Sequence, residues 1–287
     1  MSVAAIVVNY NAGEHLLACV QSLLNQSLTD IVVVDNASAD DSMQRLRGRF
    51  GDRPGVQLLF NPSNFGYGPA VNAASARLQA RYLLIINPDC VLHEDGLRHL
   101  RLALESDPQA ALAAPRVTDQ RGRFEAASCR HLPTPRRALM SLSGLGRLAR
   151  RWPALEGINV SGAADWTEPR AVDATSGACM LLRRDAWEQV GGFDEGYTLH
   201  GEDLDLMLRL QQADWSCLFV PAAKATHSQG VSSASRPLWV HREKHRSMVR
   251  FFKQYQAPHC GWLQRQLVLL GIRLHWLLLW PWKWLRR

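Results

Sequence analysis

The stretch VAAIVVNYNAGEHLLACVQSLLNQSLTDIVVVD, residues 3–35, decides the fold. Its first apolar run, residues 4–8, is continuous, as expected for a strand that is buried on both faces, and polar residues end it at positions 9–11. Apolar residues then recur at helical spacing between positions 16 and 24. A second apolar run, residues 31–34, stops at Asp35. The stretch therefore predicts a strand, a helix and a second strand.

The same alternation continues along the chain. The sequence predicts a short helix around residues 43–50, a strand near residues 56–60, a helix after Pro69 and a strand over residues 82–86. Strands that alternate with helices form βαβ units in an α/β, mainly parallel sheet, and ligands bind beyond the carboxyl ends of its strands. The residues that follow the strands are therefore candidates for a site: Tyr10 and Asn11, Asp35 and Asn36, Asn87 and Asp89.

The periodicity fades from about residue 115 to residue 172, where scattered prolines and arginines are typical of loops and short helices. Beyond this segment we expect a strand at residues 178–182, helices near 185–190 and 202–212, and a strand at 216–220. His227 would follow that last strand after a short connector. After Pro237 the composition becomes rich in leucine and tryptophan.

Composition indicates a folded protein. The chain has 287 residues, of which 47% are hydrophobic, enough for a large core. Its six cysteines lack the paired spacing of a zinc site or disulfide framework, and no secretory signal precedes the first strand, which together favour a cytoplasmic setting. The net charge of +7 is uneven: residues 236–287 hold 11 Lys and Arg against one acid, whereas the preceding residues hold 22 against 25 acids. This asymmetry predicts an anionic partner surface for the tail alone.

Two strand-end aspartates are candidates for ligand binding. A carboxylate at Asp35 can accept hydrogen bonds from a ribose or a base, although this motif standing alone favours the start of the next helix, where Asn36, Ser38 and Asp40 are good caps. Asp89, after Asn87 and Pro88, suits a hard cation such as Mg²⁺ or Mn²⁺ held against two phosphates, and an ordinary turn is the alternative.

Three acids lie close together at the start of the helix predicted for residues 202–212: Glu202, Asp203 and Asp205. Acids in a first turn often only complement the helix dipole. Three within four residues exceed that need, and their mutual repulsion predicts that at least one pKa is raised toward that of a useful general base.

Other motifs are weaker. His227 is a candidate metal ligand, although one histidine among small residues more often belongs to a plain loop. Gly66-Tyr67-Gly68 does not follow a strand directly and has Val71 where a dinucleotide fingerprint needs glycine, which excludes that site. The sequence contains no P-loop.

Taken in order, these segments resemble the family 2 glycosyltransferases of the GT-A fold, especially the branch related to bacterial rhamnosyltransferases of cell-surface polysaccharide assembly. The matching pieces are VVNYN at 7–11, VVVDNASADDS at 32–42, NPSNFGYGPAVN at 61–72, INPD at 86–89, SGACMLLRR at 176–184, GGFDE at 191–195, GEDLDLMLR at 201–209 and HSQGVS at 227–232. The resemblance implies a nucleotide-sugar-binding half at residues 1–114, an acceptor-binding half at 115–235 and a basic helical tail at 236–287.

The resemblance also implies roles for individual residues. Tyr10, Asn11 and Asp35 would contact the nucleoside, and Asn64, Gly66 and Asn72 would shape the donor pocket. Asp89 and His227 would bind Mg²⁺ or Mn²⁺, Asp203 would be the catalytic base, and Glu202, Asp205 and Trp187 would contact the acceptor or support the site. Asn87 replaces an acid that many relatives carry, which predicts weaker metal binding.

The reaction that the resemblance implies is an inverting, metal-dependent single displacement, in which Asp203 takes the proton of an acceptor hydroxyl. The donor it favours is dTDP-rhamnose. A UDP-hexose or another donor is the first alternative, and a scaffold that binds nucleotide sugars without catalysis is the second.

Residues 261–285 are numerous enough to cross a membrane, but Arg265 and Arg273 interrupt them. Tryptophans among leucines, flanked by basic residues, suit a segment in the headgroup region. This predicts a peripheral protein on the inner face of the membrane, with a glycan or polyprenyl-diphosphate-linked acceptor and no nucleic acid. A helical hairpin packed on the catalytic domain or on a partner subunit is the alternative, and a homo-oligomer is left open.

Overall fold

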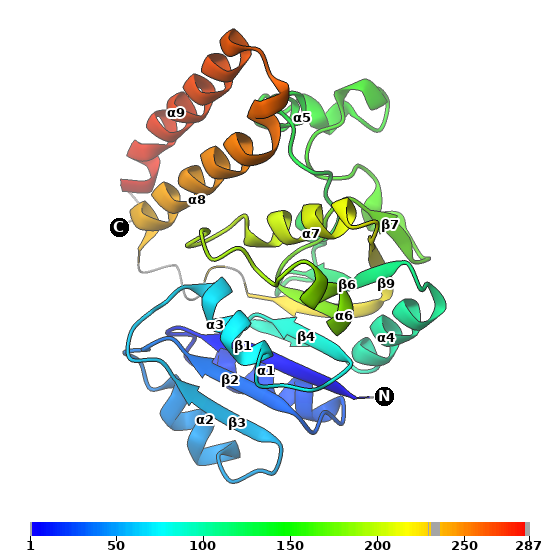
Figure 1. Ribbon diagram of the computed structural model, residues 1–287, viewed down its shortest axis with the longest axis vertical. Helices are drawn as coiled ribbons and strands as arrows, with labels where there is room; N and C mark the ends of the chain where they lie inside the picture. The colour runs from blue at the N-terminus through cyan, green and yellow to red at the C-terminus, as the bar shows by residue number, and fades with distance from the viewer. Residues whose placement is uncertain (1, 229, 231–235, 285–287) are drawn as a thin grey trace.

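The computed structural model describes residues 2–228, 230 and 236–284. Its centre is one nine-stranded sheet with the order β3-β2-β1-β4-β8-β6-β9-β5, and β7 pairs with β9 (Figure 1). The first half of the chain alternates as predicted: β1 (Val3–Asn9), α1 (His15–Asn25), β2 (Ile31–Asp35), α2 (Ser42–Phe50), β3 (Val56–Phe60), α3 (Tyr67–Ser75) and β4 (Tyr82–Ile86). The four strands of this half are parallel to one another.

The second half makes the sheet mixed. It contributes β5 (Cys90–Leu92), α4 (Gly96–Ser106), β6 (Ala110–Thr118), α5 (Pro135–Leu142), β7 (Arg170–Val172), β8 (Cys179–Arg183), α6 (Arg184–Gln189), α7 (Glu202–Gln212) and β9 (Ser216–His227). β8 runs antiparallel between β4 and β6, while β6 and β9 are parallel. The expected division after residue 114 falls inside β6, so both halves share one sheet and one core.

Side chains of the central strands alternate between the two faces of the sheet. Ala5 and Val7 of β1 pack in one buried cluster with residues of α1, α2 and α4, whereas Ala4 and Ile6 pack in a second cluster with residues of α3, α6 and α7. Helices therefore cover both faces, which explains why the apolar run of β1 is unbroken rather than alternating. This arrangement confirms the predicted α/β architecture.

β9 is longer than the sequence predicts. Residues 222–226, expected as a connector, continue the strand, because Lys224, Ala225 and Thr226 pair with β6 and the last two of them also pair with β5. His227 is the last residue of β9, where it pairs with Cys90. The expectation of a loop before His227 is therefore wrong, and the sheet itself holds this histidine.

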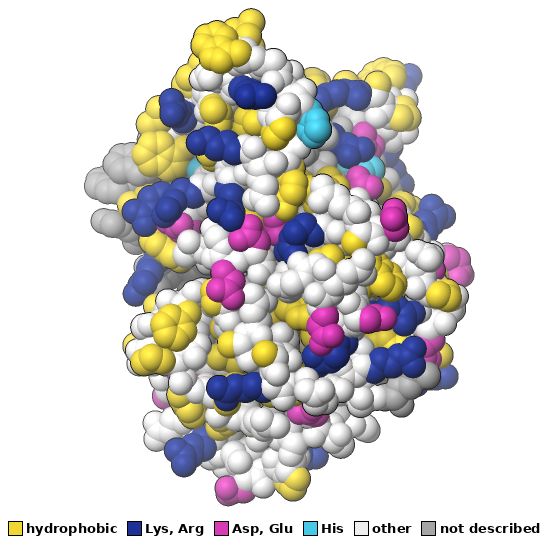
Figure 2. Space-filling model, in the orientation of Figure 1, with side chains coloured by type: hydrophobic (Ala, Val, Ile, Leu, Met, Phe, Trp, Pro, Cys, Tyr) yellow, Lys and Arg dark blue, Asp and Glu magenta, His cyan; other side chains and the backbone are white. Residues whose placement is uncertain are grey.

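The C-terminal segment forms two long helices, α8 (Pro237–Phe251) and α9 (Trp262–Trp284), which lie side by side at the end of the molecule opposite α2 and β3 (Figure 1). Lysine and arginine side chains gather over them together with hydrophobic ones (Figure 2). In the part of the chain that the structure describes, no helix is long and apolar enough to cross a membrane. α8 and α9 therefore form a helical hairpin.

Candidate active site

The ends of β1 and β2 form the first part of the site, and Asn9 connects them. The strand register pairs Asn9 with Asp35, and Asn9 Nδ2 donates to Asp35 Oδ1 over 2.9 Å. Ser38 also donates to Asp35, through its hydroxyl at 2.5 Å and its backbone N–H at 3.1 Å. Asp35 is 6% exposed. Its carboxylate therefore holds the turn after β2 in shape.

Asn11 ties the loop after β1 to the same turn. Its side-chain Oδ1 accepts from the backbone N–H of Ala39 at 2.7 Å, and its own N–H donates to Ser38 Oγ at 3.0 Å. The preceding Tyr10 is half-buried, with the Arg236 guanidinium 5.9 Å from its ring centre. Tyr10 and Asn11 thus lie beside Asp35, as the strand-end rule predicts.

Three non-glycine residues beside predicted site residues have left-handed backbone angles. They are Asn11 with φ 52°, Ala37 with φ 59° and His200 with φ 62°. This conformation is disfavoured for residues with a Cβ atom, and such residues concentrate at functional sites. The three loops that contain the candidate residues are therefore held in conformations that only their surroundings can maintain.

Asn64 and Gly66 shape the turn that leads into α3. Gly66 has φ 98°, which a residue with a side chain would adopt only with strain, and its N–H donates to Asn64 Oδ1 at 2.9 Å. Its carbonyl accepts from Asn36 Nδ2 at 2.9 Å, which connects this turn to the one after β2. The structure thus brings Asn36, Asn64 and Gly66 together.

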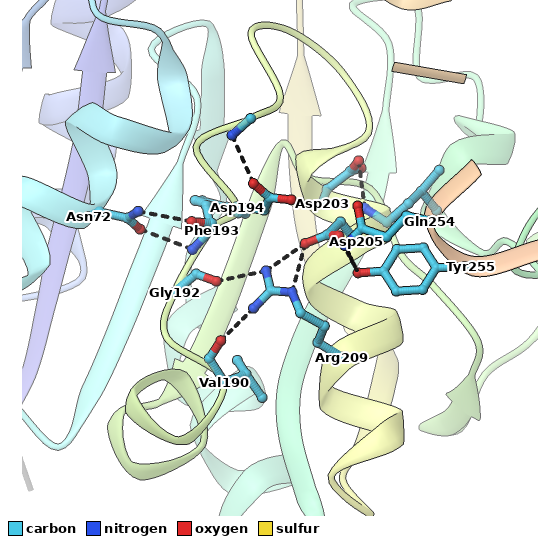
Figure 3. Close-up of polar contacts among 12 residues, drawn as sticks. Asn72, Val190, Gly192, Phe193, Asp194, Asp203, Asp205, Arg209, Gln254 and Tyr255 are labelled. Atoms are coloured by element: carbon cyan, nitrogen blue, oxygen red, sulfur yellow. Dashed lines mark hydrogen bonds and ion pairs between the residues drawn. The ribbon is translucent and has the colours of Figure 1, made fainter. Parts of the chain in front are cut away.

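Asn72 lies further along α3 and faces another loop. Its amide donates to the Phe193 carbonyl and accepts from the Phe193 N–H, both at 3.0 Å, and it also donates to Glu195 at 3.0 Å (Figure 3). Trp187 is 4% exposed and packs edge-on against Phe193 at 5.2 Å between ring centres. These contacts make Asn72 and Trp187 supports of the loop at residues 191–195.

Asp89, His227 and Glu125 form a buried row of charged groups. His227 Nε2 lies 3.2 Å from Asp89 Oδ1, and its Nδ1 lies 3.3 Å from Glu125 Oε1. Burial alone would lower the pKa of His227, but hydrogen bonds to Asp89 and Glu125 raise it to about 10. The histidine is therefore protonated at neutral pH and bridges two carboxylates.

This row also bears on the expected metal. Within the described residues, no group of three or more His, Cys, Asp or Glu side chains is arranged to hold a metal ion. Mg²⁺ in phosphate-transfer sites needs fewer protein ligands, because it is usually bound by one or two carboxylates together with substrate phosphates and water. Asp89 fits such a shared site, in which substrate completes the ligands, whereas His227 would have to give up the proton it holds between the two carboxylates before it could bind the ion.

Asp203 and Glu202 begin α7 and differ sharply in their surroundings. Arg130 Nη2 lies 2.5 Å from Asp203 Oδ2, and the side chains of this pair are only 15% and 16% exposed. Burial would raise the pKa of Asp203, but the guanidinium outweighs it and holds this pKa below its usual value. Burial and the charge of Asp203 raise the pKa of Glu202 to about 8. The expected raised pKa therefore belongs to Glu202.

The loop before β8 brings the Asp203 region and the Asp89 region together. A Cβ atom at Gly177 would lie 3.0 Å from Asp203 Cβ, so only glycine allows this approach. One residue further on, the carbonyl of Ala178 accepts from the Asn87 N–H at 2.8 Å. Burial and Glu202 raise the pKa of the buried Tyr67 hydroxyl most, and Asp203 and Asp89 raise it further. The two candidate centres thus border one region.

Asp205 serves a different purpose from its neighbours. It is fully buried, and Arg209 lies 2.6 Å from its Oδ2 while the Tyr255 hydroxyl donates to its Oδ1 at 2.5 Å (Figure 3). Arg209 in turn donates to the carbonyls of Val190 and Gly192. Asp205 therefore fastens α7 to the loop at 190–192 and to the segment after α8, which is a supporting role.

Three residues of the site escaped the sequence reasoning: Asn9, Glu125 and Arg130. Asn9 was overlooked within NYN, although its place at the end of a buried strand was a usable signal. Glu125 and Arg130 lie in the segment without periodicity and had no local signal. Of the predicted motif HSQGVS, residues 229, 231 and 232 lie outside the described residues.

Comparison with known proteins identifies the family of this chain. The family model described as glycosyl transferase family 2 matches residues 4–191, and a model described as glycosyl transferase family group 2 matches residues 164–287. The chain is 31% identical over 278 residues to N-acetylglucosaminyl-diphospho-decaprenol L-rhamnosyltransferase of Mycobacterium tuberculosis, with 91% of this chain and 86% of that protein covered. It is 30% identical over 171 residues to rhamnosyltransferase WbbL of Escherichia coli, with 57% and 61% covered.

Solved structures share the fold. The mannosyltransferase PcManGT of Pyrobaculum calidifontis, in complex with GDP-Man and Mn²⁺, superposes with a TM-score of 0.57 and covers 99% of this chain and 72% of its own. The sequence identity of this pair is 17%, so the likeness concerns the GT-A fold alone.

Proposed function

This chain belongs to glycosyl transferase family 2, and from that premise we propose that it transfers rhamnose from dTDP-rhamnose to a hydroxyl of a lipid-linked acceptor in cell-surface glycan synthesis. The names of the two rhamnosyltransferase relatives support the sugar. The name of the Mycobacterium tuberculosis relative supports an acceptor in which a diphosphate joins the glycan to a polyprenol.

The observation that carries the proposal is that the two acids at the start of α7 differ in charge state. Glu202, with a pKa of about 8, is mostly neutral at pH 7, whereas Asp203 is ionised beside Arg130. One negative charge at this position suits a single proton acceptor. We assign that role to Asp203: its carboxylate takes the proton of the acceptor hydroxyl as the oxygen attacks the anomeric carbon, and the nucleoside diphosphate leaves from the opposite face with inversion.

Arg130 would then be a positioning residue. It fixes Asp203 Oδ2, and its guanidinium also donates to the Thr175 carbonyl in the loop before β8. A carboxylate held this firmly is a weak base while the pair persists, so the acceptor hydroxyl has to approach the other oxygen, Oδ1, which otherwise accepts only from the Leu204 N–H at 2.9 Å among the described residues. The pair thus orients the base.

The donor would lie along the ends of β1, β2 and β4. The linked turns of Asn11, Asp35 and Gly66 would form the nucleoside wall, with Asp89 and His227 nearest the diphosphate. A divalent cation held by Asp89, with His227 as a second ligand only in its neutral form, would neutralise charge on the leaving diphosphate. Without it, His227 already places a positive charge beside Asp89.

We also propose that the protein works at the membrane surface through residues 236–287. In support, α9 exposes leucines on its outer face, and the segment holds 11 Lys and Arg. Basic and apolar side chains together favour anionic bilayers.

The test of the proposed function is a transfer assay with Asp203→Asn. We expect wild-type protein to glycosylate an N-acetylglucosaminyl-diphospho-polyprenol from dTDP-rhamnose in preference to UDP-N-acetylglucosamine or GDP-mannose. Asp203→Asn keeps the shape of the side chain and loses its basicity, so turnover should fall by about 10²–10⁴ while the thermal shift caused by dTDP stays near wild type.

Asp185→Asn is the matched control, because Asp185 is an exposed acid in the first turn of α6. It should retain full activity. Turnover of Asp203→Asn close to that of the wild type would remove Asp203 from the reaction, and wild-type transfer from another donor alone would refute the choice of sugar.

A further inference from the structure

A groove between α8 and α9 has the composition of a binding site. Its volume is about 710 Å³, and it is lined by both helices and by the turn after α8. Five of its lining residues are cations: Arg242, Arg246, Arg250, Lys253 and Arg273. None of the residues assigned above to the donor, the metal or the base lines it.

Acidic partners offset only part of this charge. Glu243, which is almost fully buried, pairs with Arg242 at 3.0 Å and with Arg246 at 3.3 Å, and Asp194 pairs with Arg250 at 2.7 Å. Lys253 and Arg273 make no ion pair within the part of the chain that the structure describes. The groove therefore presents excess positive charge to an anionic ligand.

The same groove also has apolar walls. Val249 of α8 and Ile272 and Trp276 of α9 lie among the cations. Along α9, leucines recur every three or four residues and are about half exposed or more: Leu263, Leu267, Leu270, Leu274 and Leu277. A ligand that uses both features has an anionic head and a long apolar chain, since a free phosphate would leave the leucines uncovered.

The groove is joined to the catalytic half by short contacts. Arg250 reaches Asp194 in the loop at 191–195, and the Ser247 hydroxyl donates to the Leu199 carbonyl at 3.0 Å, shortly before α7. The Tyr255 hydroxyl donates to Asp205, two residues after Asp203. A ligand head in the groove would thus bind next to the segments that position Asp203.

From these observations we propose that the α8–α9 groove binds the diphosphate of the lipid-linked acceptor, with its polyprenyl chain along the leucines of α9. The site rests on the proposed function for its ligand and deepens it, because it places the lipid end of the acceptor on a surface separate from the donor site. Lys253 and Arg273, the two cations of the groove that make no ion pair with a described residue, contact the diphosphate.

The experiment uses the full chain with Lys253 and Arg273 both replaced by glutamine. Binding is measured by flotation with phosphatidylcholine vesicles that contain a small fraction of undecaprenyl diphosphate. Wild type should bind these vesicles more tightly than vesicles in which phosphatidylglycerol supplies equal charge. The double variant should lose about 30-fold in affinity for the diphosphate vesicles, as expected for two cations near a charged surface.

The matched control replaces Arg47 and Arg53, two exposed arginines at and after the end of α2, by glutamine. It removes the same charge far from the groove and should bind as wild type does. Equal binding by the groove variant and wild type, or equal binding to both kinds of vesicle, would overturn the proposal. The first outcome would mean that the diphosphate binds elsewhere on the protein, and the second would mean that the groove binds ordinary lipid headgroups.

A second readout separates this proposal from the proposed function. Transfer to a water-soluble acceptor that lacks diphosphate and lipid should be unchanged in the groove variant, while KM for the lipid-linked acceptor rises about 30-fold with kcat retained. A wild-type protein without any transferase activity would refute the proposed function, yet vesicle binding would still test the groove. A fall in kcat for both acceptors would count against the groove as a binding site.

Discussion

The Arg130–Asp203 pair gives the sharpest prediction, tested by Arg130→Met. Both side chains are about 85% buried, so the substitution leaves Asp203 beside Glu202 without a compensating cation. Removing one member of a buried pair costs about 3–5 kcal/mol. For a chain of this size each kcal/mol lowers Tm by roughly 2–4 °C, so the variant should melt about 6–20 °C below wild type near pH 8.

The pH dependence of this loss has a definite sign. In wild type the pKa of Asp203 is lowered, so its pairing stabilises the fold above the usual value of 3.8 and the contribution is lost as the pH falls through the folded value. In Arg130→Met the lowering influence of the guanidinium is gone, and burial, which raises the pKa of Asp203, is opposed only by the smaller influences of the Leu204 N–H and His200. Protonation then relieves the buried charge, so the gap between the two proteins should narrow as the pH falls from 8 to 5.

The assay is thermal unfolding at pH 8 and pH 5, combined with kcat/KM for transfer across the same range. A neighbouring guanidinium typically lowers a carboxyl pKa by about 1–3 units, so the acid limb of the activity profile should move up by that amount in Arg130→Met. Arg130→Lys should restore part of both effects. Arg137→Met is the control, because its partner Asp173 is 40% exposed at 3.3 Å and such pairs contribute under about 1 kcal/mol.

An acid limb at the same pH in Arg130→Met and wild type would refute the reasoning. It would mean either that Asp203 is not the base or that Arg130 leaves it before the proton moves. Equal melting temperatures at pH 8 would show that the pair is open in solution.

Three further predictions concern other parts of the molecule. Burial, with the charges of His241, His275 and Lys244, lowers the pKa of His245 to about 4. Between pH 6.5 and 4 the unfolded chain therefore binds more protons than the folded one, and stability should fall as the solution is acidified. Urea titrations of His245→Gln should show a flatter dependence of stability on pH. Tyr255→Phe removes the hydroxyl that donates to buried Asp205 and should cost about 1.5–3 kcal/mol in thermal or urea unfolding, with an unchanged melting temperature contradicting that bond. Asp89→Asn should abolish the extra thermal stabilisation that Mn²⁺ gives the dTDP complex, while the smaller shift from dTDP alone should remain. A Mn²⁺ effect as large as that of the wild type would show that Asp89 is not a metal ligand.

The parallel half of the fold was predictable because its signals are local. An apolar run followed by polar residues marks the end of each strand, and parallel strands bring those ends to one edge. Asp35 and Asn11 could be placed near one another on this basis alone, whereas Gly66 was placed with them only by the family resemblance. The hydrogen bonds to Asp35 could not be predicted in this way, because the turn that makes them has Ala37 in a left-handed conformation, for which alanine has no preference.

The second half was less predictable for a different reason. An apolar run such as that of β8 reads the same in either direction, so its antiparallel place between β4 and β6 is set by tertiary pairing. The same pairing extends β9 to His227 and brings Glu125 to it from a segment without any periodic pattern. Charged residues from such segments are visible only once the sheet exists.

This difference explains why the sequence predicts a raised pKa among the acids at 202–205 but does not predict which acid has it. Their spacing on one helix start predicts repulsion and a raised pKa, but it cannot decide which acid carries it. That decision depends on Arg130, which comes from 73 residues earlier in the chain and pairs with Asp203 rather than Glu202. A partner supplied by the irregular segment thus determines which carboxylate stays charged, and so which one can accept a proton.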